Sequence, residues 1–506
     1  MKIVSSEAMA RIDMRTQTEF AVPSTILMED AGVKAWAAAV RLLWDGRQPR
    51  GRLVFVAGKG NNGGDAFVMA RQASQERPAA AALSIVLAAG EPPAGKDPAT
   101  MLAMCRALGI ECLDGGTDPE KVRQRIAAAA WIIDGISGTG MRGALRSPLS
   151  DIVAAMNASP ASKIAIDIPS GVGDDYSPGS PAVTAALTLT MGLPKTCLYL
   201  PHTRALAGRI FVVPVGFPAP LTQDPSIPGE LLTRGAWRRL ASVIPPDTYK
   251  NQRGHLSVFA GSIGTTGAAW LCASAAARSR LGLVTLFVDR EIYQQCAQKL
   301  TSVMCRPWEP PTHSGDAAWD PARYTGVLVG PGWGLSGEKQ QWLEQLIALP
   351  VRGVIDADGT TLLGRIASSG KLDLGGRWVL TPHPGEFSRM TGIPREAVGS
   401  DPIGHALRFS AQLNAVIVLK GHCTVIASPT GRYWVLDGAN PAMATGGSGD
   451  VLAGIVAAGV AGGLPPLEAA LFGVSLHSSV GRAAARSAGW FLAEDLVPLI
   501  SRTLAR

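Results

Sequence analysis

Short apolar runs alternate along most of the chain with longer stretches that carry apolar residues at helical spacing. The runs are rich in Val, Ile and Leu and contain few polar residues, which is typical of strands buried on both faces of a parallel sheet. The stretches between them predict helices that cover both faces. In the first half the predicted strands are Leu53–Ala57, Leu83–Ala89, Trp131–Asp134, Lys163–Ile168, Leu187–Met191 and Arg209–Val215.

A change of composition divides the chain. Between Phe217 and Glu230 the sequence becomes rich in proline and loses its hydrophobic periodicity, which predicts a linker. A chain of 506 residues is also too long for one ordinary core. We therefore expect an α/β protein of two domains, residues 1–217 and 231–506, joined by a linker over 218–230. The strands predicted in the second domain are His255–Ala260, Val284–Asp289, Val327–Val329, Val354–Asp356, Trp378–Leu380 and Ala415–Leu419, and a long helix is expected to begin near Gly449.

Charge and cysteine usage narrow the class of protein. The net charge is +7, and the Lys and Arg residues are scattered rather than gathered into a stripe, so we expect no nucleic-acid partner. Residues 1–20 lack the apolar core of a signal peptide, and no run reaches membrane-spanning length. The seven cysteines have no Cys-x-x-Cys spacing, which favours reduced, mostly buried thiols over a metal site. A cytoplasmic protein without a membrane partner is the expectation.

Three glycine-rich or Asp-containing turns follow predicted strands of the first domain. They are Gly58–Asp65, Gly135–Gly140 and Asp167–Gly171. Glycines let the backbone approach a ligand, and the N-terminus of the following helix favours phosphate. Together the turns offer oxygen atoms suited to a hard cation. Taken singly, the first motif is equally compatible with a tight turn, and an Asp at a strand end with a helix cap; their coincidence favours a site.

The second domain carries the most specific motif of the chain, Asn440–Gly454, with the sequence NPAMATGGSGDVLAG. A glycine-rich turn that opens a helix forms an anion pocket, and Asp450 stands in the first turn as a candidate base. Lys420–Thr424 follows one predicted strand and would suit a nucleotide phosphate. Thr381–Glu386 follows another, and its prolines would fix His383 in a turn where a substrate contact is favoured over a purely structural role.

The residues of the first domain resemble the NAD(P)HX epimerases, the N-terminal domain of bifunctional enzymes that repair hydrated NADH and NADPH (NAD(P)HX). The resemblance runs from about Ser5 to Phe217 and includes Pro23–Gly32, Gly60–Asp65, Asp167–Gly171 and Pro194-Lys195. It departs from the family at Ala66, usually Gly, and at Asp30, often Asn. It implies a Rossmann-like three-layer domain.

The same resemblance implies roles for individual residues. Asp167 would be the catalytic acid or base, because epimerisation requires proton movement beside the substrate. A potassium ion would be held by Asn62, Asp134 and Ser170. The implied NAD(P)HX contacts are Asn61, Asn62, Gly63, Gly64, Asp65, Gly138, Thr139, Gly140, Met141, Arg142, Gly143, Ala144 and Asp167.

The second domain looks like the ribokinase-like superfamily, and within it like the ADP-dependent NAD(P)HX dehydratases. Tyr249-Lys250, Gly261-Ser262, Gly330–Gly332 and the His383, Lys420 and Asp450 motifs carry the likeness, over about Leu231–Val497. It implies that Asp450 is the catalytic base, that Mg²⁺ bridges the nucleotide phosphates, and that the enzyme forms homo-oligomers. The implied NAD(P)HX contacts are Ala268, Gly332, His383 and Asp450, and the implied ADP contacts are Lys420, Gly421, His422, Cys423, Thr424 and Gly449.

The implied function is a two-step repair. The first domain would interconvert the R and S hydrates, and the second would dehydrate the S hydrate to NAD(P)H, using ADP and releasing AMP and phosphate. Three other interpretations stay open on the sequence. The second domain would otherwise be a small-molecule kinase that yields a stable phosphorylated product. The first would be an NAD-dependent dehydrogenase, for which Glu91 is the nearest acidic residue after the second strand. In the third interpretation, the whole chain is a nucleotide-binding scaffold in which Asp167 and Asp450 have no catalytic role.

Overall fold

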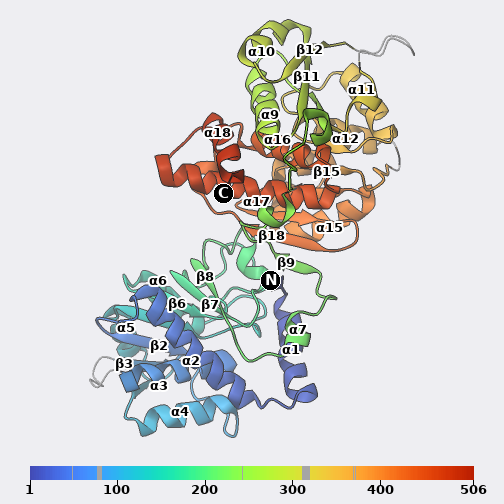
Figure 1. The fold of residues 1–506 in the computed structure, drawn as a ribbon. Helices are drawn as coiled ribbons and strands as arrows, with labels where there is room; N and C mark the ends of the chain where they lie inside the picture. The colour runs from blue at the N-terminus through green and yellow to red at the C-terminus, as the bar shows by residue number, and fades with distance from the viewer. Residues whose placement is uncertain are drawn as a thin grey trace. The chain divides into compact units, whose positions relative to one another are not determined.

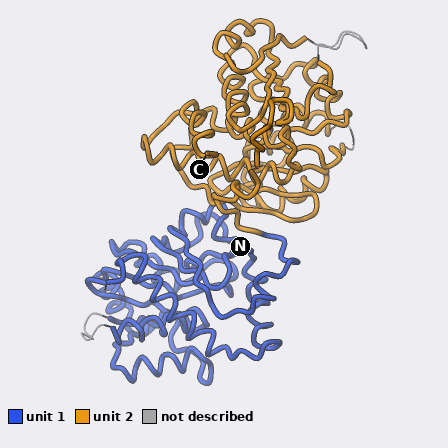
Figure 2. Tube along the Cα trace, in the orientation of Figure 1, with its two compact units in different colours: residues 1–229 blue, residues 230–506 orange. Residues whose placement is uncertain are grey.

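The computed structural model describes residues 1–47, 49–76, 83–241, 243–309, 319–368, 370 and 372–505. The chain forms two compact units, residues 1–229 and 230–506 (Figure 2). Most of the segment predicted as a linker belongs to the first unit. There helix α7 (Ala219–Thr222) packs on α1 (Ser6–Glu19), and Leu221 is buried with Met9 and Ile12. The buried Leu221 side chain therefore anchors this proline-rich segment to the first unit, although the segment has no hydrophobic periodicity.

The first unit is built on a sheet in which neighbouring strands run parallel, in the order β4-β3-β2-β5-β6-β7-β8 (Figure 1). Each strand predicted for this half is present. The prediction missed β4, a short edge strand with a charged residue at each end. The strands are β2 (Leu53–Ala57), β3 (Leu83–Leu87), β4 (Glu111–Asp114), β5 (Trp131–Gly135), β6 (Ser162–Ile166), β7 (Leu187–Met191) and β8 (Arg209–Val213), and β1 (Lys2–Ile3) precedes them.

Helices cover both faces of this sheet because its strands are apolar on both sides. Leu53 and Phe55 of β2 pack against α2, α3 and α4, whereas Val54 and Val56 pack against α5 and α6. The result is the three-layer arrangement that was predicted. Besides α1 and α7, the helices are α2 (Ser24–Leu43), α3 (Asn61–Glu76), α4 (Asp97–Ala107), α5 (Pro119–Ala127), α6 (Leu149–Ala158) and the 3-10 turn η2 (Thr196–Tyr199).

The sheet of the second unit runs in the order β9-β18-β17-β16-β15-β14-β13-β10-β11-β12. Its strands are parallel from β16 to β12, as predicted, but β16, β17 and β18 pair antiparallel. The prediction missed β9, β12, β17 and β18. The bounds are β9 (Gly229–Leu231), β10 (His255–Phe259), β11 (Leu283–Asp289), β12 (Met304–Trp308), β13 (Gly326–Val329), β14 (Gly353–Ile355), β15 (Trp378–Leu380), β16 (Val416–Leu419), β17 (Cys423–Ala427) and β18 (Tyr433–Asp437).

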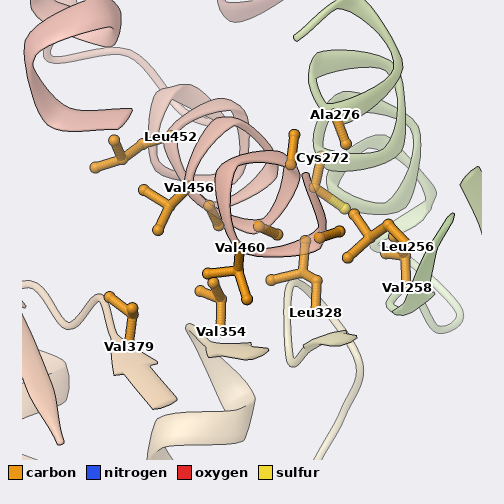
Figure 3. Close-up of a cluster of buried hydrophobic side chains, with 14 of the residues drawn as sticks. Leu256, Val258, Cys272, Ala276, Leu328, Val354, Val379, Leu452, Val456 and Val460 are labelled. Carbon is orange, nitrogen blue, oxygen red and sulfur yellow. The ribbon is translucent and has the colours of Figure 1, made fainter. Parts of the chain in front are cut away.

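Two helices form the centre of the core on one face of this sheet. Val456 and Val460 of α16 (Ser448–Ala461) and Cys272 of α9 (Thr266–Arg278) pack on Leu256 and Val258 of β10 and on the neighbouring strands (Figure 3). The helix expected near Gly449 is α16. The remaining helices are α8 (Trp237–Leu240), α10 (Tyr293–Lys299), α11 (Gly337–Ala348), α12 (Asp358–Ser368), α13 (Pro384–Thr391), α14 (Arg395–Ser400), α15 (Pro402–Leu413), α17 (Pro466–Ala488) and α18 (Ala493–Leu504), with 3-10 turns η3 (Lys250–Arg253), η4 (Arg290–Ile292), η5 (Pro321–Arg323) and η6 (Pro441–Met443).

Two further observations bear on the class of protein. All seven cysteines lie in the described part of the chain and are free thiols, five of them buried. No helix in the described ranges combines the length and the apolar character needed to cross a membrane.

Candidate functional sites

A cavity of about 550 Å³ lies at the carboxyl ends of β2, β5, β6 and β7 in the first unit, the edge at which open α/β sheets bind ligands. It brings together residues from all three turns singled out in the sequence. Of the predicted NAD(P)HX contacts, those that line it are Asn61, Asn62, Asp65, Gly138, Thr139, Gly140, Met141, Arg142 and Asp167. Gly143 and Ala144 instead line a neighbouring cavity of about 700 Å³.

Of the glycines after β2, Gly60 lines the cavity, whereas Gly63 and Gly64 serve close packing. A Cβ at Gly63 would lie 2.0 Å from the carbonyl oxygen of Gly58, and one at Gly64 would lie 2.4 Å from the sulfur of Met28. Both positions therefore require glycine for the turn to enter α3. Ala66, where a glycine was expected, is fully buried; the close approach is made instead by Gly135, where a Cβ would lie 2.7 Å from that of Ala66.

Asp134, Ser170 and Asn62 meet beneath the cavity. The fully buried carboxylate of Asp134 accepts hydrogen bonds from the Ser170 hydroxyl (2.6 Å) and backbone N–H (2.8 Å). Asn62 donates through its side-chain nitrogen to the Ser137 carbonyl (2.8 Å), and Ser170 Oγ lies 3.3 Å from that carbonyl. Burial raises the pKa of Asp134 to about 6, against the effect of the Ser170 hydrogen bonds. Among the described residues no cationic side chain pairs with this carboxylate, so the oxygen-rich donor set fits a monovalent cation.

A buried ion pair sits in the wall of the cavity. Lys195 is fully buried, and its ammonium group contacts Asp167 Oδ1 and the Met191 carbonyl (2.6 Å). Asp167 Oδ1 also accepts from the Met191 N–H (3.1 Å). The backbone of Asp167 is left-handed, with φ +64°, a conformation that Asp tolerates better than most residues and that here turns its side chain toward β7. The sequence analysis named Pro194-Lys195 as part of a motif but gave Lys195 no role.

Asp65 is a second acidic group of the same cavity. Desolvation raises its pKa well above the ordinary value, and the negative charges of Asp167 and Asp13 raise it further, while Lys195 opposes them. The cavity therefore holds one carboxyl group whose pKa is raised by burial and one carboxylate that is paired with a cation. A buried acid beside a second carboxyl group is a common arrangement of acid and base partners.

In the second unit, Lys420 stands at the end of β16 between two carboxylates. Its Nζ lies 2.8 Å from Asp356 Oδ1 and 3.5 Å from Glu386 Oε2, and Thr381 Oγ1 donates to the same Asp356 oxygen (2.8 Å). Burial acts to lower the pKa of Lys420, but Asp356 and Glu386 outweigh it and the pKa is raised. Lys420 is therefore a fixed positive charge, 17% exposed, at the carboxyl edge of the sheet.

Asp450 and the start of α16 face this cation. A Cβ on Gly449 would lie 3.3 Å from Lys420 Nζ, and one on Gly447 (φ +90°) would lie 3.8 Å from Asp450 Oδ2. Burial raises the pKa of Asp450 to about 7; repulsion by Asp356 adds to this, and Lys420 works against it. A carboxyl group that titrates near neutrality, next to a helix N-terminus and a fixed cation, is suited to accept a proton beside a phosphate.

His383 has a structural role that the sequence analysis did not anticipate. Its Nδ1 accepts hydrogen bonds from the N–H groups of Gly385 (2.9 Å) and Glu386 (3.4 Å), so it caps α13. Nε2 lies 3.3 Å from Glu386 Oε1. Burial lowers the pKa of His383, which keeps the ring neutral at pH 7. The side chain is still 50% exposed, so the ring can contact a ligand as well.

Hydrogen bonds join the loop after β10 to the loop after β13 on the α9 side of the site. The Gly332 carbonyl accepts from Thr265 Oγ1 (2.6 Å) and from Ser262 Oγ (3.0 Å). Gly332 adopts φ +56°, and a Cβ there would lie 3.0 Å from that of Ala268, so the predicted contacts Ala268 and Gly332 are neighbours. Of the predicted ADP contacts after Lys420, Gly421 and His422 lie in the turn from β16 into β17, and Cys423 and Thr424 begin β17. Thr424 Oγ1 donates to the Gly421 carbonyl (3.1 Å).

Comparison with known proteins places both sites in one family. The NAD(P)H-hydrate dehydratase model matches residues 256–503, and the model of the YjeF-related protein N-terminus matches residues 24–197. A bifunctional NAD(P)H-hydrate repair enzyme Nnr of Moorella thermoacetica is 32% identical over all of this chain and 97% of that protein. The chain belongs to the bifunctional NAD(P)H-hydrate repair enzymes. This confirms the resemblance drawn from the motifs, and it accounts for both halves, which the dehydrogenase interpretation did not.

A second repair enzyme agrees with this assignment, and one solved structure is similar to part of the chain. The enzyme of Mycobacterium tuberculosis is 34% identical over 83% of this chain and 80% of its own. The structure of an ADP/ATP-dependent NAD(P)H-hydrate dehydratase from Bacillus subtilis, co-crystallised with ATP and Mg²⁺, covers 54% of this chain and 98% of its own, at 27% identity and a TM-score of 0.48. The roles of individual residues in this repair enzyme stay predictions, which the geometry above makes specific.

Proposed function

We propose that this repair enzyme epimerises R- and S-NAD(P)HX in the first unit and dehydrates S-NAD(P)HX in the second with ADP, releasing AMP and phosphate. The observation that carries the proposal is the placement of Asp450 in the first turn of α16, whose start faces the Lys420 cation, in a chain whose first unit holds a separate acidic cavity. The site of the second unit has the groups for phosphoryl transfer. The site of the first unit has groups that can donate and accept protons at the hydrated nicotinamide ring.

In the first unit, Asp65, whose raised pKa favours its protonated form, would protonate the hydroxyl on ring carbon six. The hydroxyl would leave as water while the ring nitrogen's electron pair forms a C=N bond. Water then adds to the opposite face and loses its proton to Asp167, which gives the other epimer. Lys195 holds the Asp167 carboxylate in place. Proton exchange with solvent returns both carboxyl groups to their starting states.

Potassium would be held beside this cavity by Asn62, Asp134 and Ser170. Its charge would balance the buried Asp134 carboxylate and stiffen the turns that carry Asn62 and Ser170. The proton transfers above do not pass through the ion.

In the second unit, Asp450 would take the proton of the C6 hydroxyl as its oxygen attacks the terminal phosphorus of ADP. The bond between that phosphorus and the bridging oxygen breaks, and AMP leaves. Lys420 and the N–H groups of the Gly446–Gly449 turn stabilise the phosphoryl oxygens. Phosphate then leaves C6 with its bonding electrons, a proton is lost from C5, and the C5=C6 double bond of NAD(P)H is restored.

Magnesium would enter this site bound to the nucleotide. Within the described ranges, no group of three or more His, Cys, Asp or Glu side chains is arranged to hold a metal ion. This fits the usual behaviour of Mg²⁺, which binds mainly through substrate phosphates and water. When bound, it would neutralise charge on the phosphates that Lys420 contacts.

The test is recovery of reduced-nicotinamide absorbance from a purified mixture of R and S hydrates, with ADP, with ATP or without nucleotide. Full recovery that depends on ADP supports both activities. Recovery of the S portion alone would refute the epimerase assignment. A stable phosphorylated product without NAD(P)H would show a kinase instead of a dehydratase.

The proposed cation site predicts an effect of K⁺ on the first unit. Replacing K⁺ by Li⁺ is expected to slow epimerisation and to lower the melting temperature of the first unit by several degrees, because a ligand at one hundred times its Kd stabilises the folded state by about 2.7 kcal/mol. Differential scanning calorimetry in the two salts measures the shift. Asp134→Asn should remove the difference between the salts, whereas Asp151→Asn, at an exposed position of α6, should keep it. An equal shift in both variants would contradict the assignment.

The pKa of Asp450 predicts the pH dependence of dehydration. The base must be ionised, so activity is present above the raised pKa of about 7 and is lost as the pH falls through it. At pH 6 the rate should be roughly a tenth of its plateau, since one pH unit below the pKa leaves about one group in ten ionised. The measurement is single-turnover dehydration of the S hydrate from pH 5.5 to 9. A flat profile would exclude Asp450 as the base.

A further inference from the structure

The neighbouring cavity of about 700 Å³ lies at the carboxyl ends of β3 and β4. It shares Met141 and Arg142 with the cavity that holds Asp65 and Asp167. A ligand long enough to pass these two residues would therefore occupy both cavities. Neither Asp65 nor Asp167 lines the second one, so it takes no part in the proton transfers.

The topology of the sheet explains why two cavities adjoin. From β2 the chain proceeds outward to β3 and β4, then returns to place β5 on the other side of β2. The point where strand order reverses is where open α/β sheets bind dinucleotides, with one half of the ligand on each side. The first cavity extends from this point toward β7 and the second toward β4. The hydrated nicotinamide belongs beside Asp65 and Asp167, which leaves the second cavity for the adenosine half.

The charges around the second cavity are unbalanced. Arg142 and Arg146 line it, and Lys59 Nζ lies 3.8 Å from the position of a Cβ on Gly90, in the same wall. In the described part of the chain, none of these three cations forms an ion pair; Arg142 donates only to the Met141 carbonyl (3.0 Å). Asp114 is the acidic residue of the lining. Its Oδ1 accepts from the N–H groups of Gly116 (2.7 Å) and Thr117 (3.3 Å), and its Oδ2 lies 3.7 Å from the same Cβ position on Gly90 that Lys59 approaches.

We propose that this cavity binds the adenosine half of the hydrated dinucleotide, and that Lys59, Arg142 and Arg146 bind the 2′-phosphate that distinguishes NADPHX from NADHX. The proposal rests on the proposed epimerase function. Three cations against one carboxylate favour a dianionic phosphate. An enzyme selective for NADH instead places an acidic residue where it binds the ribose hydroxyls; here Asp114 shares the space beside Gly90 with Lys59, and Glu91 is paired with Arg106. The epimerase site therefore prefers NADPHX.

The experiment follows exchange of R and S hydrates by NMR in the full chain without nucleotide, so that dehydration does not intervene. For wild type, kcat/KM for NADPHX should exceed that for NADHX by about tenfold, the product of two partly exposed charge contacts. The double variant Lys59→Ala/Arg146→Ala should lose this preference through a rise in KM for NADPHX, with NADHX changed less than about twofold. The control Arg47→Ala/Arg50→Ala removes the same charge from the loop before β2, at the opposite end of the strand, and should retain the preference.

A second readout does not depend on the variants. Adenosine 2′,5′-bisphosphate should inhibit wild-type epimerisation about tenfold more strongly than adenosine 5′-monophosphate. Equal inhibition by the two compounds, or equal turnover of NADHX and NADPHX by wild type, would overturn the proposal while leaving the epimerase function intact. Failure of wild type to exchange either hydrate would instead refute the proposed function itself.

Discussion

Replacing Asp450 by asparagine is expected to slow dehydration of S-NAD(P)HX by about 100- to 10,000-fold, the usual contribution of a positioned general base, while epimerisation is unchanged. Asparagine keeps the shape of the side chain but accepts no proton at neutral pH. The Lys420 cation and the start of α16 stay in place, so ADP should bind with nearly unchanged affinity. Single-turnover absorbance recovery gives the rate, and calorimetric titration with ADP gives the affinity.

A nearby carboxylate provides the matched control. Asp358 also raises the pKa of Asp450, but its Oδ2 accepts from the Gly334 N–H (2.8 Å) and it takes no proton in the mechanism. Asp358→Asn should retain most of the rate and move the pH profile to lower values, because a repelling charge is removed. Equal losses in the two variants would mean that Asp450 acts through loop structure, and the role of base would be withdrawn.

The alternation of strands and helices could be predicted from the sequence because buried parallel strands are apolar on both faces. The strands that the prediction missed are not central parallel strands with two apolar faces. Strand β4 is an edge strand with Glu111 and Asp114 at its ends. Strands β17 and β18 are joined by a short turn through Gly431, and a pattern that expects a helix after each strand passes over a hairpin. A local pattern is therefore a better guide to central strands than to edges and hairpins.

For the candidate sites, too, the sequence predicts some of the residues and not others. Lys420 and Asp167 could be named because each stands at the end of an apolar run, and Asp450 because it follows a glycine-rich turn that opens a helix. Their partners could not, since Asp356 lies 64 positions from Lys420 and Lys195 lies 28 positions from Asp167. Which strand ends become neighbours depends on strand order, and no local pattern contains that order. The raised pKa of Asp65 likewise depends on desolvation that arises only in the folded protein.

Lys195→Met is expected to abolish epimerisation and to lower the free energy of unfolding of the first unit by about 3–5 kcal/mol. Removing one partner of a buried ion pair leaves the other as an uncompensated charge, and Asp167 has no other cation within ion-pair distance in the described residues. Asp167→Asn should lower epimerisation by about 100- to 10,000-fold at a smaller cost in stability, because Lys195 keeps its contact with the Met191 carbonyl.

Urea unfolding of the full chain, followed by NMR exchange of the hydrates, separates these two effects. The matched control is Lys163→Met on β6, whose ammonium group donates to the Ser159 carbonyl (2.7 Å) and forms no ion pair with a carboxylate among the described residues. It should keep epimerisation near wild type, since no charge beside the substrate changes. Wild-type exchange rates in folded Lys195→Met would show that the ion pair does not serve the reaction. Lys195 would then only stabilise the turn after β7, and the acid and base roles of Asp65 and Asp167 would need to be reassigned.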